Sequence, residues 1–115
     1  MRYRVVVAPR ARQRLAEGAL WYARESASDD IAREWHAGFV KALDSLAENS
    51  QRCSIAAESE DLLIEIREIL YGSGRKKTHR ALFRVVGDEV QVLTIRHFAE
   101  RDVTADDVEL PCDPR

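Results

Sequence analysis

Two runs of β-branched and aromatic residues in the second half of the chain constrain its fold most strongly. The runs His79–Val86 and Glu89–Arg96 suit a pleated surface, and only Gly87-Asp88 lies between them. Glycine accepts a positive φ without a Cβ penalty, so this pair is typical of a two-residue hairpin turn. The sequence therefore predicts a β-hairpin over these two runs.

The turn also predicts the register of the hairpin, because side chains alternate between the two faces of a strand. If Val86 faces Glu89, the next pairs are Arg84–Gln91, Leu82–Leu93 and Arg80–Ile95. One face then has the composition of a core: Ala81, Phe83, Val85, Val90, Val92 and Thr94. The other face is basic and partly apolar: Arg80, Leu82, Arg84, Gln91, Leu93, Ile95 and His97. We expect this second face to contact a partner or substrate.

The first half of the chain indicates one strand and two helices. Alternation over Arg2–Ala8 predicts a strand, and Pro9 suits the first turn of a helix that runs to about Arg24. Ser26 or Ser28 can cap a second helix, whose first turn carries two aspartates. The apolar stripe of that helix is Ile31, Trp35, Phe39, Leu43 and Leu46. Both tryptophans of the chain, Trp21 and Trp35, are interpreted as packing residues.

The remaining segments complete an α+β fold. Residues 48–61 show no period and are interpreted as a connector, Leu62–Tyr71 resumes strand character, and residues 72–78 (GSGRKKT) form a loop. We expect an N-terminal strand, a helical hairpin and a three-stranded antiparallel meander that form one sheet. A single domain covers residues 1–108, and 109–115 are an acidic tail, disordered or preceded by one helical turn at Thr104–Val108.

Composition limits the function classes. A chain of 115 residues with 45% hydrophobic and 33% charged residues is one globular domain. It contains no apolar run of about 18 residues and no signal-peptide pattern, so we expect a cytoplasmic protein. Cys53 and Cys112 lack the close spacing of a zinc or redox pair and are expected to be reduced. We expect no metal and no cofactor.

Charge is concentrated rather than scattered. Between Ile66 and Arg84 six residues are basic and one is acidic, whereas the chain from Glu100 onward carries six acids and two arginines. This asymmetry suggests an anionic partner for one region, although a solvated loop at residues 75–77 explains part of it equally well. The candidate target-binding residues are Arg67, Arg75, Lys76, Lys77, Arg80, Arg84 and Arg96.

Several short motifs, in order, resemble the RelE/ParE superfamily of type II toxin-antitoxin toxins, which includes plasmid stabilisation proteins. They are the opening strand with its Ala-Pro step, the Trp35 helix, IREIL at residues 66–70, HRALF at 79–83 and VQVLTIRH at 90–97. His79 stands where the family more often has tyrosine. The resemblance implies a small α+β toxin and a cognate antitoxin. We expect the antitoxin to cover the mixed sheet face, around exposed Leu82, Leu93 and Ile95, or the adjoining helices.

The resemblance leaves two activities open. RelE-like members are ribosome-dependent mRNA endonucleases, and in that case His97, Arg80 and Arg84 would be the catalytic residues, for proton transfer and for phosphate charge. ParE-like members inhibit DNA gyrase without acting as enzymes. The lysines ahead of the HRALF strand and the late tyrosine of RelE-like enzymes are missing here, and His97 could simply bond a neighbouring loop. We therefore favour the ParE-like inhibitor; a fold retained with little toxicity remains a third reading.

Overall fold

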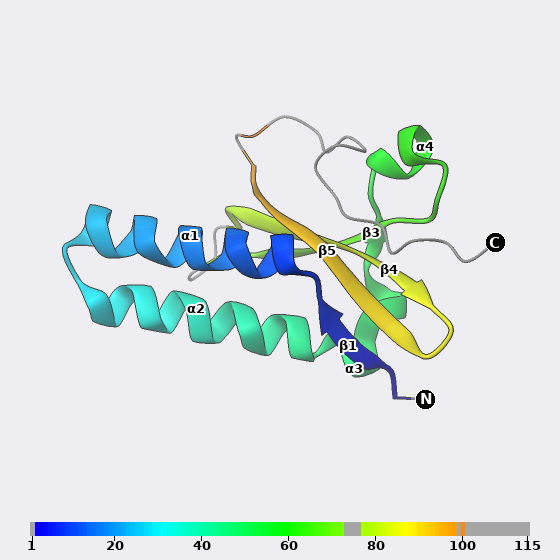
Figure 1. The fold of residues 1–115 in the computed structure, drawn as a ribbon, viewed down its shortest axis with the longest axis horizontal. Helices are drawn as coiled ribbons and strands as arrows, with labels where there is room; N and C mark the ends of the chain where they lie inside the picture. The colour runs from blue at the N-terminus through cyan, green and yellow to red at the C-terminus, as the bar shows by residue number, and fades with distance from the viewer. Residues whose placement is uncertain (1, 73–76, 99, 101–115) are drawn as a thin grey trace.

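The computed structural model describes residues 2–72, 77–98 and 100, and it is organised around a five-stranded sheet (Figure 1). The strand order is β1-β5-β4-β3-β2, in which β1 is parallel to β5 and the other neighbours are antiparallel. The strands are β1 (Arg4–Val7), β2 (Ser54–Ile55), β3 (Arg67–Tyr71), β4 (His79–Val86) and β5 (Glu89–His97). The helices are α1 (Pro9–Ser26), α2 (Asp29–Asp44), α3 (Leu46–Asn49), the 3-10 turn η1 (Ser50–Arg52) and α4 (Glu58–Leu62).

The predicted α+β class is confirmed, but the sheet is larger than expected. A three-stranded meander with one added strand would give four antiparallel or mixed strands, whereas the sheet has five. The extra strand, β2, lies within residues 48–61, which lack a visible period and also contain η1 and part of α4. A two-residue strand is too short to leave an alternating pattern in the sequence.

The helical hairpin covers one face of the sheet, and its far end extends beyond the strands (Figure 1). Pro9 occupies the first turn of α1, as predicted. Ser28, rather than Ser26, caps α2, because its side chain accepts a hydrogen bond from the Ile31 amide at 3.3 Å. The predicted apolar stripe is wrong at both ends: Ile31 is exposed, with Ala32 buried instead, and Leu46 lies in α3 because α2 ends at Asp44.

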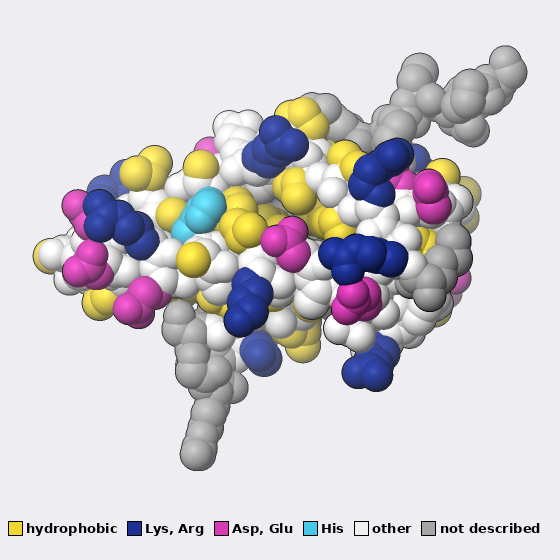
Figure 2. Space-filling view, turned by 90° about the horizontal axis from the view of Figure 1, so that it is seen from below, with side chains coloured by type: hydrophobic (Ala, Val, Ile, Leu, Met, Phe, Trp, Pro, Cys, Tyr) yellow, Lys and Arg dark blue, Asp and Glu magenta, His cyan; other side chains and the backbone are white. Residues whose placement is uncertain are grey.

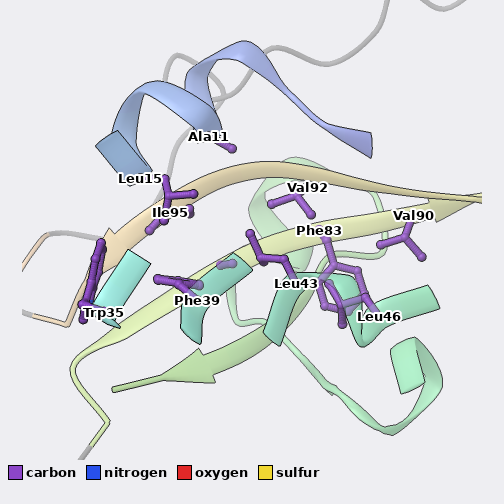
Figure 3. Packing of buried hydrophobic residues seen from close by; sticks show 11 residues of the cluster. Ala11, Leu15, Trp35, Phe39, Leu43, Leu46, Phe83, Val90, Val92 and Ile95 are labelled. Atoms are coloured by element: carbon purple, nitrogen blue, oxygen red, sulfur yellow. The ribbon is translucent and has the colours of Figure 1, made fainter. Parts of the chain in front are cut away.

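The main core lies between this hairpin and the sheet (Figure 3). Ala11 and Leu15 of α1 point toward β5, while Phe39 and Leu43 of α2 join the same core, and the Phe39 ring stacks on Tyr71 of β3 with centroids 4.4 Å apart. Trp35 is buried among aromatic rings, with centroids 5.1 Å from Tyr22 and 5.4 Å from Phe39. Trp21, the second tryptophan, is half exposed, so only one of the two is a core residue.

A β-bulge changes the predicted register of the hairpin. The pairs Val86–Glu89 and Arg84–Gln91 form as expected, but Phe83 pairs with Val92 and Leu82 with Thr94, which leaves Leu93 as the extra residue of β5. The predicted pairs Leu82–Leu93 and Arg80–Ile95 are therefore wrong. Because the side-chain period of a strand is two, one extra residue moves every later side chain of β5 to the opposite face.

A second, smaller core lies on the other face of the sheet. Ala56, Ile66, Leu82 and Leu93 are buried there, and Leu62 and Ile64 pack against them from α4 and the segment after it. The predicted strand Leu62–Tyr71 begins only at Arg67, since α4 runs to Leu62 and Leu63 adopts a left-handed conformation with φ of 58°. The predicted loop core at residues 73–76, Cys112, the Thr104–Val108 turn and the acidic tail lie outside the described residues.

No helix in the described part of the chain combines the length and apolarity needed to cross a membrane.

Candidate functional site

Arg80, the arginine of the HRALF motif, lies in an acidic pocket on the second face of the sheet. Its guanidinium forms two hydrogen bonds with the carboxylate of Glu58, one of them 2.9 Å long, and a third with Glu68 at 3.2 Å. Glu58 sits in the first turn of α4 and is only 1% exposed. These hydrogen bonds raise the pKa of Arg80, so the group stays charged, but its charge is balanced inside the protein.

Two of the other predicted target-binding cations lie on the same face of the sheet as Arg80, since Arg96 is its cross-strand partner and Arg84 follows it four residues later on β4. Arg67 donates to the Cys53 carbonyl at 2.6 Å, Arg84 donates to Gln91 at 2.8 Å, and Arg96 forms an ion pair with Glu100 at 3.3 Å. Lys77 is exposed at the start of β4, whereas Arg75 and Lys76 lie outside the described residues. Arg80, Arg84 and Arg96 therefore share one face of the sheet, whereas Arg67 is the cross-strand partner of Phe83, which belongs to the main core on the other face.

The predicted partner-binding residues Leu82, Leu93 and Ile95 are buried, with exposures of 1%, 1% and 2%. The expectation that they are exposed is wrong, for two physical reasons. The segment that includes α4 covers Leu82 and Leu93, although its sequence suggested only a connector. The bulge turns Ile95 toward the helical hairpin, where it joins the main core.

The three candidate nuclease residues are divided between the two faces of the sheet, with His97 on one face and Arg80 and Arg84 on the other. His97 pairs with His79, and the two rings are 4.9 Å apart on the face covered by α1 and α2. Arg80 and Arg84 point to the other face, together with Leu82 and its second core. The prediction that His97 shares their face is wrong, because the bulge lies between Val92 and His97.

His79 and His97 line a pocket of about 380 Å³ between α1 and the end of β5. Arg14 also lines this pocket. The Arg14 Nε donates to the Ile95 carbonyl at 3.0 Å, and the guanidinium forms an ion pair with Glu100. Glu100 also accepts a hydrogen bond from the His97 amide at 3.0 Å. Burial raises the pKa of Glu100, but the His97 amide and the two arginines outweigh it, so the net shift is downward.

A longer groove lies beside the edge strand β1, between that strand and α2, and its volume is about 520 Å³. Its lining is mainly apolar, with Val5, Val7, Leu15, Val40 and Leu43. Arg4, Arg12, His36 and Asp44 also line it. Figure 2 shows the face seen from below, where hydrophobic side chains form a band with Lys and Arg on both sides. We call the groove beside β1 the β1–α2 groove.

Sequence reasoning missed the acids that organise both faces. Glu58 was part of an apparent connector, and only the Glu-Ser-Glu-Asp run after two alanines hints at a short helix with acids in its first turn. Glu100 looked like the start of an acidic tail. In the described part of the chain, no three His, Cys, Asp or Glu side chains are close enough to enclose a metal ion.

Comparison with known proteins places this architecture in a class. A chain from the solved structure of the chromosomal ParDE TA system from P. aeruginosa superposes with a TM-score of 0.66. The two are 18% identical, and the match covers 83% of this chain and 95% of that one, so the likeness concerns the fold. No curated protein sequence matches significantly.

The sequence itself identifies the family. The model that describes the ParE toxin of the type II toxin-antitoxin system parDE matches residues 5–101. The protein belongs to the ParE toxin family. Membership also implies a cognate antitoxin as its partner.

Proposed function

We propose that this ParE-family toxin inhibits DNA gyrase by binding and does not cleave RNA. The observation that carries the proposal is the separation of His97 from Arg80 and Arg84 on opposite faces of the sheet. Metal-free RNA cleavage requires a proton-transfer group and phosphate-binding cations within reach of one phosphodiester. A sheet between the histidine and the arginines prevents them from acting on the same bond.

The state of Arg80 supports the same proposal. A cation that stabilises a developing phosphate charge must meet the substrate, but the Arg80 side chain is 14% exposed and already holds two carboxylates. Displacing Glu58 would leave a buried carboxylate without its partner, which is costly. Arg80 is therefore better suited to holding α4 on the sheet than to binding RNA.

We further propose that the antitoxin occupies the β1–α2 groove. The groove has an apolar floor, an edge strand with one unpaired side, and two arginines in its lining. An apolar antitoxin segment flanked by acidic residues fits this combination by shape and by charge. The surface expected from sequence, around Leu82, Leu93 and Ile95, is unsuitable because these residues are buried.

Two assays on the same purified protein test the activity. We expect inhibition of gyrase supercoiling, reversed by the co-encoded antitoxin, and no ribosome-dependent cut in a primer-extension assay. Because His97 is exposed, the substitution His97→Ala should leave gyrase inhibition intact. Cleavage of translating mRNA by the unmodified protein, lost on the order of a hundredfold in His97→Ala, would establish the nuclease instead.

A further inference from the structure

We infer that the cross-strand pair of His79 and His97 binds one divalent transition-metal ion, such as Zn²⁺ or Cu²⁺, at the end of the β4–β5 hairpin. This site shares no lining residue with the β1–α2 groove, and it departs from the sequence-based expectation that the protein holds no metal. Imidazole nitrogens are common ligands of both ions.

The register supplies the first argument. His79 and His97 are direct partners across β4 and β5, so their side chains leave the sheet on the same face. Their ring centroids are 4.9 Å apart, with the planes at 87°. A tetrahedral ion with metal–nitrogen bonds of about 2.1 Å would hold two imidazole centres about 5 Å apart. The pair therefore has the separation that shared coordination requires without movement of either strand.

The surroundings of His79 supply the second argument. Its Nδ1 lies 2.8 Å from the Thr78 hydroxyl, and a bond from Nδ1–H to that oxygen would leave the Nε2 lone pair for a metal. Ring contacts with Trp35 and Tyr22 hold the imidazole in place.

The pocket supplies the third argument, because it gives the ion access and room for further ligands. It opens beside His97, which is exposed, and its volume of about 380 Å³ accommodates an ion with several waters. Since the described residues offer no third protein ligand in a closed cluster, water completes the coordination. With two protein ligands, such a site is open to solvent rather than closed by four protein ligands like a structural zinc site.

Titration of the untagged protein with Zn²⁺, followed by calorimetry, tests the inference. We expect one ion per chain, with an affinity at least tenfold weaker in His97→Gln and in His79→Gln. His36→Gln is the matched control, because the third histidine of the chain lines the β1–α2 groove and should not affect binding. Because His97 is exposed, its variant should keep the fold, which circular dichroism can verify.

Cu²⁺ provides an independent readout of location. Trp21 lines the pocket and the Trp35 ring lies 5.1 Å from His79, so bound Cu²⁺ should quench tryptophan fluorescence and show two nitrogen ligands by electron paramagnetic resonance. His97→Gln should reduce the count to one nitrogen. Unchanged Zn²⁺ affinity in His97→Gln, loss of binding in His36→Gln, or no binding up to about 1 mM Zn²⁺ would each overturn the inference.

Discussion

Glu58 and Arg80 form a two-pronged ion pair that joins the short helix α4 to the middle of the sheet. The pair is almost fully enclosed, with side-chain exposures of 1% for Glu58 and 14% for Arg80. It also covers the second core, since α4 leads directly into Leu62 and Ile64. This contact links the HRALF strand to local stability.

Neutralising Glu58 should therefore destabilise the protein. Glu58→Gln keeps the shape of the side chain but removes one of the carboxylates that balance the Arg80 charge, and breaking a buried pair costs about 3 kcal/mol. Urea unfolding measures the change. Glu60→Gln on the same helix is the control, because Glu60 is exposed and should cost less than about 0.5 kcal/mol. Equal stability of the two variants would contradict a structural role for the pair.

Acid should destabilise the protein through His79. Burial lowers the pKa of His79 from 6.5 to about 4; nearby His97 and Arg14 also lower it, and Glu100 opposes them. The unfolded chain takes up a proton below pH 6.5 but the folded one only near pH 4. The resulting stability is complete above pH 6.5 and is lost as the pH falls toward 4. The loss between pH 7.5 and pH 5 should be about 2 kcal/mol.

Urea unfolding across this pH range checks the effect. His79→Gln should remove most of the slope, whereas His36→Gln should keep it. An unchanged slope in His79→Gln would assign the acid sensitivity to other groups.

Gly38 and Tyr71 should be energetically coupled. A Cβ at Gly38 would come within 2.2 Å of the Tyr71 hydroxyl, which donates to the Trp35 carbonyl at 3.0 Å. Gly38→Ala alone should be destabilising by overpacking, although alanine favours helices by about 1 kcal/mol. Tyr71→Phe alone should cost about 1 kcal/mol through the lost hydrogen bond.

The double variant is the informative one. Removing the hydroxyl leaves Cζ at 3.2 Å as the nearest atom, so the added methyl group fits with a small shift. A double-mutant cycle by thermal unfolding should give a coupling of about 1 kcal/mol or more. Strict additivity would show that α2 moves away from β3 instead.

Antitoxin binding should depend on charge in the β1–α2 groove. Arg12 is exposed on α1 and lines the groove, so Arg12→Glu should repel acidic antitoxin residues and weaken binding about tenfold. Arg52→Glu is the control, because Arg52 is equally exposed but lies on η1, outside the groove lining. Calorimetry with the co-encoded antitoxin measures both. Equal affinities would place the antitoxin elsewhere.

The fold could be predicted from sequence where period and turn chemistry agree. The turn at Gly87, which has a φ of 59°, is found as expected, and Ser28 is the cap among the two serines that local rules allowed. The β-bulge could not be predicted, since Leu93 fits an alternating strand as well as any residue nearby. Its position depends on the packing of Leu93 against Leu82 and Ile66, which are distant in sequence.

The same limit applies to the site. The identities of Arg80, His79 and His97 were visible in the sequence, but the face to which each points depends on the bulge. The partners of Arg80 depend on a five-residue helix whose sequence carries little periodic signal. Sequence patterns therefore located the chemical groups, whereas tertiary packing decided which of them meet.

The parallel pairing of β1 with β5 sets an order in which the newly made chain can fold. Arg4 and Glu89, which pair and form an ion pair, are 85 residues apart. The helical hairpin between them makes mainly local contacts and can form while synthesis continues. The first strand, by contrast, has no place in the sheet until β5 has left the ribosome. A toxin built in this way completes its β1–α2 groove only after β5 has been made, so a translation product interrupted before β5 has no sheet on which β1 can form the groove floor.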